Sequence, residues 1–569
     1  MSKKLQLKSA DITAGIQSTK HLLKEVEHLK QEIKQLKSRK RYGLVWENKP
    51  EQVVELCKEQ LPVLAEEKDK KIKTGIEKPV NILIEGDNYH ALSVLNYTHE
   101  KKIDVIYIDP PYNTGAKDWK YNNNYVDSND AFRHSKWLSM MKNRLLLAKK
   151  LLKENGVLIC AIDDNEQAHL GVMLEELFPE RETHCITIVH NPRGVQGKNF
   201  SYTHEYAYFV FKKGLKVIST RKILENEKDW NNLRKWGGES DRSSARNCFY
   251  PVIIKEGKIV GFGEVLPDSI HPKRQAIKRG GKYFVFPIDS SGVERKWRYA
   301  RQSIEGVKNL LRARKTDNGY EIEIGKDFGI VRTVWQDKRY DASVYGTQLV
   351  HGLVPNTHFD FPKSVWNTYD CIAPILSNRK NAVLLDFFAG SGTTGHAVAL
   401  LNKDDSGNRQ YILCTNNENG IAQEVCYPRI KAVIKGNKDY KDITGISSNL
   451  KYFKTDFVDG RATDKNKKKL VDKSTEMLCL KEDCFDEVKK GKDFKIFGNH
   501  REKYLGIIYD DDGIEIFKKE VRKINKNFVI YVFSLDDSAR EEEFEDIKNL
   551  VELKPIPAVI LNVYKHIFK

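Results

Sequence analysis

The sequence predicts an α/β fold with a mostly parallel sheet that a separate, inserted domain interrupts. From about residue 80, short apolar runs alternate with helix-length amphipathic segments, which is typical of parallel strands joined by crossover helices. The same alternation returns at 381–415. Between these two stretches, residues 213–350 are rich in Arg, Lys, Trp and paired glycines, and this change of composition indicates the insertion.

The first part of the predicted sheet contains two apolar runs, 103–108 and 156–162, with an amphipathic helix between them. We expect this helix to end at Asn155-Gly156, because both residue types favour helix C-termini. The two runs would then be parallel neighbours. In the second part, residues 381–402 read as strand, glycine-rich turn and helix, and 411–415 as the next strand of the same sheet.

Changes of composition and charge divide the chain into five parts. They are an N-terminal helical segment, 1–78; the first part of the sheet domain, 79–212; the inserted domain, 213–350; the second part of the sheet domain, 351–455; and a small C-terminal α/β domain, 456–569, that follows a basic linker. In the first part, heptad spacing of Leu22, Val26, Leu29, Ile33 and Leu36 fits either a dimerisation helix or an amphipathic helix packed on its own domain.

Composition limits the class of protein and of partner. The 569 residues carry a formal net charge of +17, which favours a nucleic acid as partner, although basic solvated surfaces give the same excess. No apolar run approaches the roughly 18 residues of a membrane-spanning helix, and the start lacks a secretory signal, so we expect a cytoplasmic protein with no membrane contact. The nine scattered cysteines predict free thiols and no metal site.

The most specific motif is Asp109-Pro110-Pro111-Tyr112, directly after the apolar run 103–108. The carboxyl ends of strands are where open α/β sheets bind ligands. A site that modifies an aromatic amino group must accept hydrogen bonds from its N–H groups, and the Asp109 carboxylate and the Pro110 carbonyl are acceptors. Tyr112 offers an aromatic plane for an unstacked base. The alternative is a stiff turn that merely ends a strand.

A second motif, 386–394 (DFFAGSGTT), also follows an apolar run and opens a predicted helix. Its glycines allow a ligand to approach the backbone closely. The spacing differs from the GxGxxG of dinucleotide sites, and the lysine of phosphate-binding loops is missing. The motif therefore favours a nucleoside cofactor without phosphates.

Together the two motifs resemble those of the amino-methyltransferases of DNA. Their order, with the catalytic motif first, the cofactor motif second and a variable segment between them, resembles the β class of these enzymes. Further matches make most of the chain similar to the modification (Mod) subunit of type III restriction-modification systems. These matches are Asn113-Thr114-Gly115, Trp137, Arg144-Leu145, Ile162-Asp163-Asp164, His204-Glu205-Tyr206 and Phe361-Pro362-Lys363, with the opening RYGLVWENKPE and the closing helix.

The resemblance implies a Rossmann-like methyltransferase domain that uses S-adenosyl-L-methionine, with the insertion as its target-recognition domain. It assigns the flipped adenine to Asp109, Pro110, Pro111 and Tyr112. It assigns the cofactor to Asp87, Lys363, Asp386, Phe388, Gly390, Gly392, Thr393 and Asn417. The reaction implied is methyl transfer to N6 of adenine, with no covalent intermediate on the enzyme.

Three of the cofactor assignments have competing interpretations. Asp87 stands in a Gly-Asp turn, which is common after strands, and Lys363 needs no special purpose if its side chain is exposed. Many relatives place an acidic residue for the ribose at the end of the next strand, whereas this chain has Asn416-Asn417-Glu418. Asn417 or Glu418 could replace that residue.

The partners predicted are double-stranded DNA, a second copy of the chain in a homodimer, and a separate restriction subunit, because the chain has no GxxxxGK[ST] loop and no nuclease motif. The alternatives are a DNA-recognition subunit that has lost catalysis, a cytosine-N4 methyltransferase and, less favoured, an RNA enzyme. Candidates for DNA contacts within the insertion are Arg234, Lys235, Arg242, Arg246, Arg295, Arg298, Arg312 and Arg314.

Overall fold

The computed structural model describes residues 47–568, except 76, 197–198, 223–227, 318, 356, 358, 360–361, 438–443 and 500, together with Val26 and Lys30. The predicted heptad seam therefore lies almost entirely outside the described residues.

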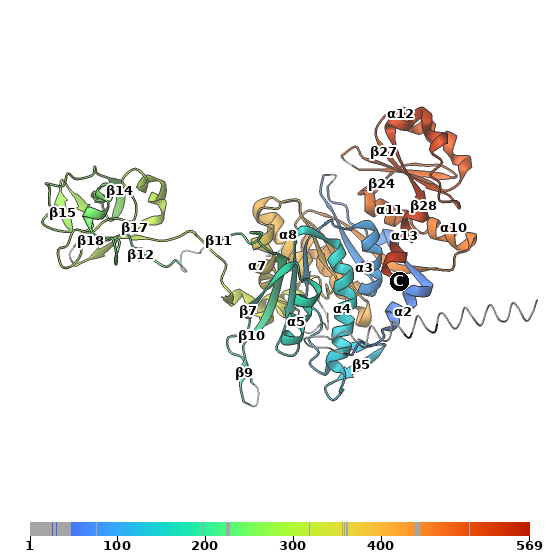
Figure 1. The fold of residues 1–569 in the computed structure, drawn as a ribbon, viewed down its shortest axis with the longest axis horizontal. Helices are drawn as coiled ribbons and strands as arrows, with labels where there is room; N and C mark the ends of the chain where they lie inside the picture. Colours follow the sequence, from blue (N-terminus) through green and yellow to red (C-terminus); the bar gives the residue numbers. More distant parts are fainter. Residues whose placement is uncertain are drawn as a thin grey trace, which may run out of the picture.

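A ten-stranded sheet forms the centre of the molecule, in the order β1-β23-β2-β22-β21-β3-β6-β10-β7-β20 (Figure 1). Its six middle strands, from β23 to β6, are parallel to one another. The strands are β1 (Gln60–Glu66), β2 (Val80–Glu85), β3 (Ile103–Ile108), β6 (Leu152–Ile162), β7 (Arg181–Val189), β10 (His204–Lys212), β20 (Val334–Gln336), β21 (Val383–Asp386), β22 (Gln410–Thr415) and β23 (Asn449–Asp459). Two predictions are confirmed. Residues 103–108 and 156–162 form parallel neighbouring strands, and the two parts of the sheet domain belong to one sheet.

Helices cover both faces of this sheet, so its central strands are mostly apolar, and every residue of β3 is buried. One face packs against α2 (Gln52–Glu59), α3 (Asn88–Thr98), α4 (Arg133–Leu151) and α5 (Gln167–Leu177). The other packs against α6 (Leu349–Leu353), α7 (Val365–Leu376), α8 (Thr393–Asp405) and α9 (Tyr427–Lys435). Each face has its own hydrophobic core.

Helix α4 ends earlier than predicted. Its last residue is Leu151, and Asn155-Gly156 lies in a bulge of β6, where the register against β3 shifts between Ile103 and Val105. Gly156 is needed there because a Cβ atom would lie 2.6 Å from Leu152 Cδ2 and 3.0 Å from the Ile103 carbonyl oxygen. The glycine therefore serves close strand packing and not a helix cap.

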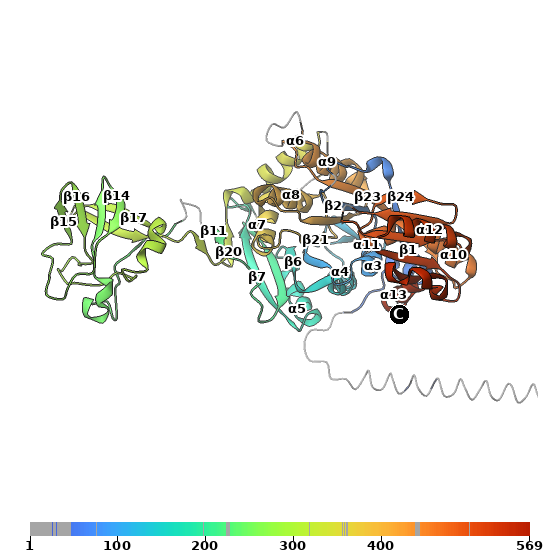
Figure 2. The same ribbon diagram turned by 90° about the horizontal axis from the view of Figure 1, so that it is seen from above.

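The insertion forms a separate domain beside the sheet domain (Figures 1 and 2). The short pair β11 (Arg221–Lys222) and β19 (Phe328–Gly329) connects the two. One of its sheets consists of β12 (Asn231–Asn232), β17 (Leu311–Thr316) and β18 (Gly319–Ile324). The other consists of β13 (Val252–Lys255), β14 (Lys258–Phe262), β15 (Ala276–Arg279) and β16 (Lys282–Val285). Two short hairpins, β4 (Ala116–Tyr121) with β5 (Asn124–Asp127) and β8 (Val195–Gln196) with β9 (Ser201–Tyr202), project from the sheet domain.

Two edge strands cross the domain boundaries that the sequence predicts. Strand β1 lies within the N-terminal segment 1–78 but pairs with β23, and β20 lies within 213–350 but pairs with β7. Strand β20 has only three residues, and β1 contains an apolar run, 61–65, that does not reveal its pairing with a strand far along the chain.

The C-terminal residues form a smaller α/β domain. Its sheet has the order β24 (Asp486–Lys490), β25 (Phe494–Gly498), β26 (Tyr504–Ile508), β27 (Phe528–Phe533) and β28 (Val551–Ile556), and its helices are α10 (Asp464–Asp472), α11 (Thr475–Glu482) and α12 (Ile514–Ile524). The last helix, α13 (Ala558–Ile567), returns to the sheet domain, where the Tyr564 hydroxyl donates to the Pro62 carbonyl. Among the described residues, no helix has the length and apolar character to cross a bilayer. All nine cysteines are free thiols, as predicted.

Candidate active site

The two sequence motifs meet at one edge of the sheet although more than 270 residues separate them. Strands β3 and β21 are parallel neighbours, with Leu384 opposite Val105 and Leu385 opposite Ile106. Asp109 directly follows the first strand, and Asp386 ends the second. The turns that leave these strands therefore start side by side.

The Asp109 carboxylate belongs to a cluster of polar side chains brought together from three parts of the chain. The Tyr112 hydroxyl lies 2.8 Å from Asp109 Oδ1 and 3.2 Å from Glu205 Oε2. Lys363 Nζ donates to Tyr112 Oη, lies 2.5 Å from Glu205 Oε2 and 3.3 Å from Asp109 Oδ1. Asn367 on α7 donates to Glu205 Oε1 at 2.6 Å. Glu205 thus holds Lys363 at the catalytic motif.

Burial and the Lys363 ammonium shift the pKa of the Asp109 and Glu205 carboxyls in opposite directions. Burial raises the pKa of Asp109 above its ordinary value, and the nearby Lys363 ammonium only partly offsets this. Burial also acts to raise the pKa of Glu205, but Lys363 and His190 hold it below its ordinary value. The Glu205 side chain is 7% exposed and the Asp109 side chain 29%. Glu205 and Lys363 therefore form a buried ion pair, while Asp109 is accessible from the edge of the sheet.

The two prolines make the turn rigid and leave an acceptor free. Trp137 on α4 donates from Nε1 to the Pro111 carbonyl at 2.7 Å and so anchors the turn. The Pro110 carbonyl accepts no hydrogen bond from the described residues. Asp109 Oδ2 and the Pro110 carbonyl are therefore two acceptors in the same turn that no described group occupies, and an amino group requires two such acceptors.

The glycine-rich turn divides the predicted cofactor residues into two groups. Asp386 is buried and accepts from the Phe388 amide at 2.9 Å and the Thr394 hydroxyl at 2.5 Å. The Thr393 hydroxyl is buried against Arg429. These two side chains stabilise the turn itself. Phe388 and Gly390 are partly exposed at the edge of the sheet.

Positive φ angles show why this turn needs glycine. They are 50° at Gly390 and 81° at Gly392, where most side chains are disfavoured. A Cβ atom on Gly390 would make only ordinary van der Waals contacts, 3.8 Å from the Phe359 ring and 3.9 Å from the Phe388 carbonyl oxygen, so the backbone there is open to a ligand. An open backbone beside two aromatic rings fits a flat nucleoside.

Asp87 lies next to this turn and caps helix α3 by accepting from the Tyr89 amide at 2.7 Å. Its neighbour Asn88 donates to the Phe387 carbonyl at 2.9 Å, which ties the end of β2 to the glycine-rich turn. Arg144 lies 3.4 Å from Asp87 Oδ1. A third of the Asp87 side chain is exposed, so the carboxylate can take a further donor.

Among the described residues, neither Lys363 nor Asn417 forms a hydrogen bond or ion pair with the glycine-rich turn. Lys363 was predicted at the cofactor, but its direct contacts are with the catalytic motif. Asn417 is exposed and accepts from the Gln423 amide at 3.1 Å, while the Gln423 side chain donates to Glu85 Oε1 at 2.9 Å. Glu85, the last residue of β2, brings a carboxylate to the edge where the expected acidic residue is missing.

Sequence reasoning assigned no role to Glu205, Asn367 or Glu85. Glu205 appeared only within a family match, and Asn367 lies on a helix with no motif of its own. Glu85 could have been found, because it ends an apolar strand immediately before Gly86-Asp87. The other two require knowledge of which helices and strands become neighbours.

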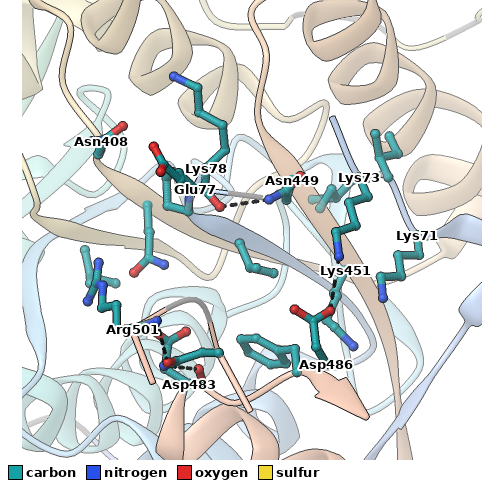
Figure 3. Close-up of a pocket in the computed structure, with 18 of the residues that line it drawn as sticks. Lys71, Lys73, Glu77, Lys78, Asn408, Asn449, Lys451, Asp483, Asp486 and Arg501 are labelled. Carbon is teal, nitrogen blue, oxygen red and sulfur yellow. Dashed lines mark hydrogen bonds and ion pairs between the residues drawn. The ribbon is translucent and has the colours of Figure 1, made fainter. Parts of the chain in front are cut away.

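A cavity of about 430 Å³ lies at the opposite edge of the sheet, facing the C-terminal domain (Figure 3). Its wall includes the first residues of four strands, Val80, Val383, Gln410 and Asn449. Its lysines are partly neutralised, since Lys73 pairs with Asp486 at 3.2 Å. Because α/β sheets bind ligands at the carboxyl edge, this cavity is a domain junction and not the predicted site.

Comparison with known proteins identifies the family. Residues 103–425 match the N6_N4_Mtase model, described as a DNA methylase. The chain belongs to this family. The membership confirms the predicted fold class and a DNA-methylating enzyme that uses S-adenosyl-L-methionine.

Two relatives and one solved structure illustrate the similarity. The type II methyltransferase M.KpnI of Klebsiella pneumoniae is 32% identical, over 66% of this chain and 88% of that protein. The type III restriction-modification enzyme EcoPI Mod subunit of Escherichia phage P1 is 29% identical, over 63% of this chain and 60% of that subunit. The M1.HpyAVI–SAM complex is 14% identical, with a TM-score of 0.29, over 61% of this chain and 98% of that one. The match thus spans less than two thirds of the Mod subunit.

Proposed function

We propose that this DNA methylase transfers the methyl group to N6 of an adenine flipped out of duplex DNA. The observation that carries this proposal is the pair of acceptors at the catalytic turn, the Asp109 carboxylate and the free Pro110 carbonyl. An exocyclic amino group has two N–H donors, and one acceptor for each draws electron density toward the nitrogen. S-adenosyl-L-methionine supplies an electrophilic methyl group when bound.

The residues of the site act on the amino group and the base. Asp109 and Pro110 accept the two N–H bonds, which makes the amino nitrogen more nucleophilic, and Asp109 receives the proton that the methylated nitrogen loses. The Tyr112 ring stacks on the flipped base, which offsets part of the few kcal/mol that unstacking costs. Pro111, held by Trp137, keeps the two acceptors in place. Phe388, Gly390, Gly392 and Asp87 hold the cofactor, while Asp386 and Thr393 shape its turn.

We also propose that the chain is the modification and specificity subunit of a type III restriction-modification system. The similarity to the EcoPI and StyLTI Mod subunits supports this assignment. The insertion between the two motifs serves as the target-recognition domain. A homodimer and a separate restriction subunit for cleavage belong to the same proposal.

The test of the chemistry compares the wild-type chain with Asp109→Ala on unmethylated genomic DNA and tritiated cofactor. We expect label in the wild-type reaction, in N6-methyladenine after digestion to nucleosides, and none with Asp109→Ala. Asp404→Asn is the matched control, because Asp404 is an exposed carboxylate at the end of α8. Binding of DNA and cofactor to each variant is measured in parallel to show that the fold is intact.

Each other outcome has a distinct meaning. Label in N4-methylcytosine would overturn the choice of base. No label from the wild-type chain, with DNA binding retained, would identify a recognition subunit without catalysis. Equal transfer by the wild-type chain and Asp109→Ala would show that Asp109 is not the acceptor.

A further inference from the structure

Three side chains capable of binding a metal ion meet next to the catalytic turn. They are His134 in the first turn of α4, Glu166 just before α5 and His169 in the first turn of α5, and one ligand atom from each lies within 4.8 Å of the others. His134 Nδ1 is 2.6 Å from Glu166 Oε1, and His169 Nδ1 is 3.1 Å from Glu166 Oε2. The sequence-based expectation of no metal site rested on the spacing of the cysteines. These three side chains form no local motif, since 31 residues separate the first two of them.

The cluster contains polar atoms that the described side chains leave unsatisfied. Glu166 is completely buried. Its Oε1 accepts from His134 and, at 2.5 Å, from Asn113 Nδ2, whereas its Oε2 has no hydrogen-bond partner. His169 Nδ1, beside Oε2, has none either. Buried polar atoms without partners are costly, so a group that binds both atoms would stabilise the fold.

The donor set suits a transition metal. Two imidazole nitrogens and one carboxylate form a common ligand set for Zn²⁺ and for other divalent ions of the first transition row. The two histidine side chains are 36% and 41% exposed, so an ion can enter from solvent, and water can complete its coordination. The imidazole rings are tilted by 31° with centroids 4.5 Å apart, so the two rings lie next to each other.

We propose that His134, Glu166 and His169 bind one divalent transition-metal ion, of which Zn²⁺ is the natural representative. The ion would fasten the first turns of α4 and α5 to Glu166. Glu166 in turn holds Asn113, the residue after Tyr112, and Trp119 donates to Asn113 Oδ1 at 3.0 Å. The site therefore has a structural role that supports the catalytic turn and takes no part in methyl transfer.

Binding requires one local rearrangement. Arg133 Nε now donates to His134 Nε2 at 3.2 Å, so the Nδ1 atom carries the proton that it shares with Glu166. When Nδ1 coordinates a metal, the proton moves to Nε2 and Arg133 must turn away. Removing this arginine should therefore tighten the site.

The experiment uses the untagged full chain, freed of metal with a chelator and titrated with Co²⁺ and then Zn²⁺. We expect one equivalent of Co²⁺ to give visible d–d absorption that one equivalent of Zn²⁺ removes. His169→Ala should weaken the affinity at least tenfold, and Arg133→Ala should strengthen it. His184→Ala is the matched control, since His184 pairs with a single carboxylate, Glu182, at 3.4 Å.

Two results would overturn the proposal. One is a wild-type chain that binds neither ion more tightly than His169→Ala does. The other is equal loss of affinity in His169→Ala and His184→Ala. Circular dichroism and cofactor binding check that each variant is folded. The outcome is independent of the base that the enzyme methylates, because the measurement is metal affinity and not activity.

Discussion

Replacing Asp386 by Asn should change how the stability of the sheet domain depends on pH. Asp386 is buried, and its only hydrogen-bond donors among the described residues are the Phe388 amide and the Thr394 hydroxyl, both neutral. Burial raises the pKa of Asp386 to about 7, although these two hydrogen bonds act to lower it. Asparagine keeps the acceptor for the amide and removes the titrating group.

The direction of this pH dependence follows from which state of the chain, folded or unfolded, holds the Asp386 proton. The unfolded chain releases this proton near its ordinary pKa of 3.8, and the folded protein retains it until about pH 7. Between these values the folded state binds more protons, so its stability falls as pH rises. At about 1.4 kcal/mol per pKa unit, the loss approaches about 4 kcal/mol above pH 7. Asp386→Asn should lack this loss.

Hydrogen exchange measured by mass spectrometry can follow the strands concerned. The chain has several domains, so its global unfolding is not a two-state transition. We therefore compare the protection of peptides from β21 and β22 in the wild-type chain and in Asp386→Asn, without cofactor, at about pH 5 and about pH 8. Comparison at equal pH cancels the intrinsic exchange rate. Asp404→Asn controls for loss of an exposed carboxylate.

The expected result is a variant that gains protection relative to the wild-type chain as pH rises. An infrared band of a protonated carboxyl, present near pH 6 in the wild-type chain and absent from Asp386→Asn, would identify the group directly. Two results together would refute the reasoning. The first is a difference in protection between the two proteins that is the same at about pH 5 and about pH 8, and the second is a wild-type chain without the infrared band.

Three further predictions concern other parts of the molecule. Arg144→Met should destabilise the sheet domain by about 3–5 kcal/mol in chemical denaturation, because it leaves the buried Glu51 carboxylate without the guanidinium that now lies 2.7 Å away; Glu51→Gln in the same protein should restore part of the loss. Gly392→Ala should lower the melting temperature and cofactor affinity, since φ is 81° and the new Cβ would lie 3.0 Å from Cys426 Sγ; unchanged calorimetry would contradict this. Arg298→Ala should weaken DNA binding and reduce the slope of log K against log salt by about 1, whereas Arg242→Ala should instead unfold the insertion.

The contrast between these two arginines shows what the sequence could not reveal. Both were candidates for DNA contacts on composition alone. Arg242 is buried and donates to the carbonyls of Leu266, Pro267 and Ile270, so it stabilises the insertion. Arg298 is exposed and forms no ion pair with the described residues. Residue type indicates charge, whereas burial decides whether that charge is available to a ligand.

The sheet and its catalytic edge were predictable for a simple reason. The two strands that carry the motifs, β3 and β21, are almost entirely buried, so their sequences are short and mostly apolar runs, and the motifs lie at their ends. Strand β20 is too short to carry this signal, and the apolar run 61–65 of β1 does not by itself reveal which sheet it joins. Nor does local sequence reveal clusters such as Glu205 with Lys363, because their members meet only after distant helices and strands pack together.

The paired strands β11 and β19 place the two ends of the insertion next to each other, with Arg221 opposite Gly329. A module whose entry and exit points coincide can be exchanged for another without altering the scaffold that carries it. If the insertion is the target-recognition domain proposed above, new DNA sequence preferences can arise through recombination within this one segment, while the strand ends of the sheet domain stay unchanged.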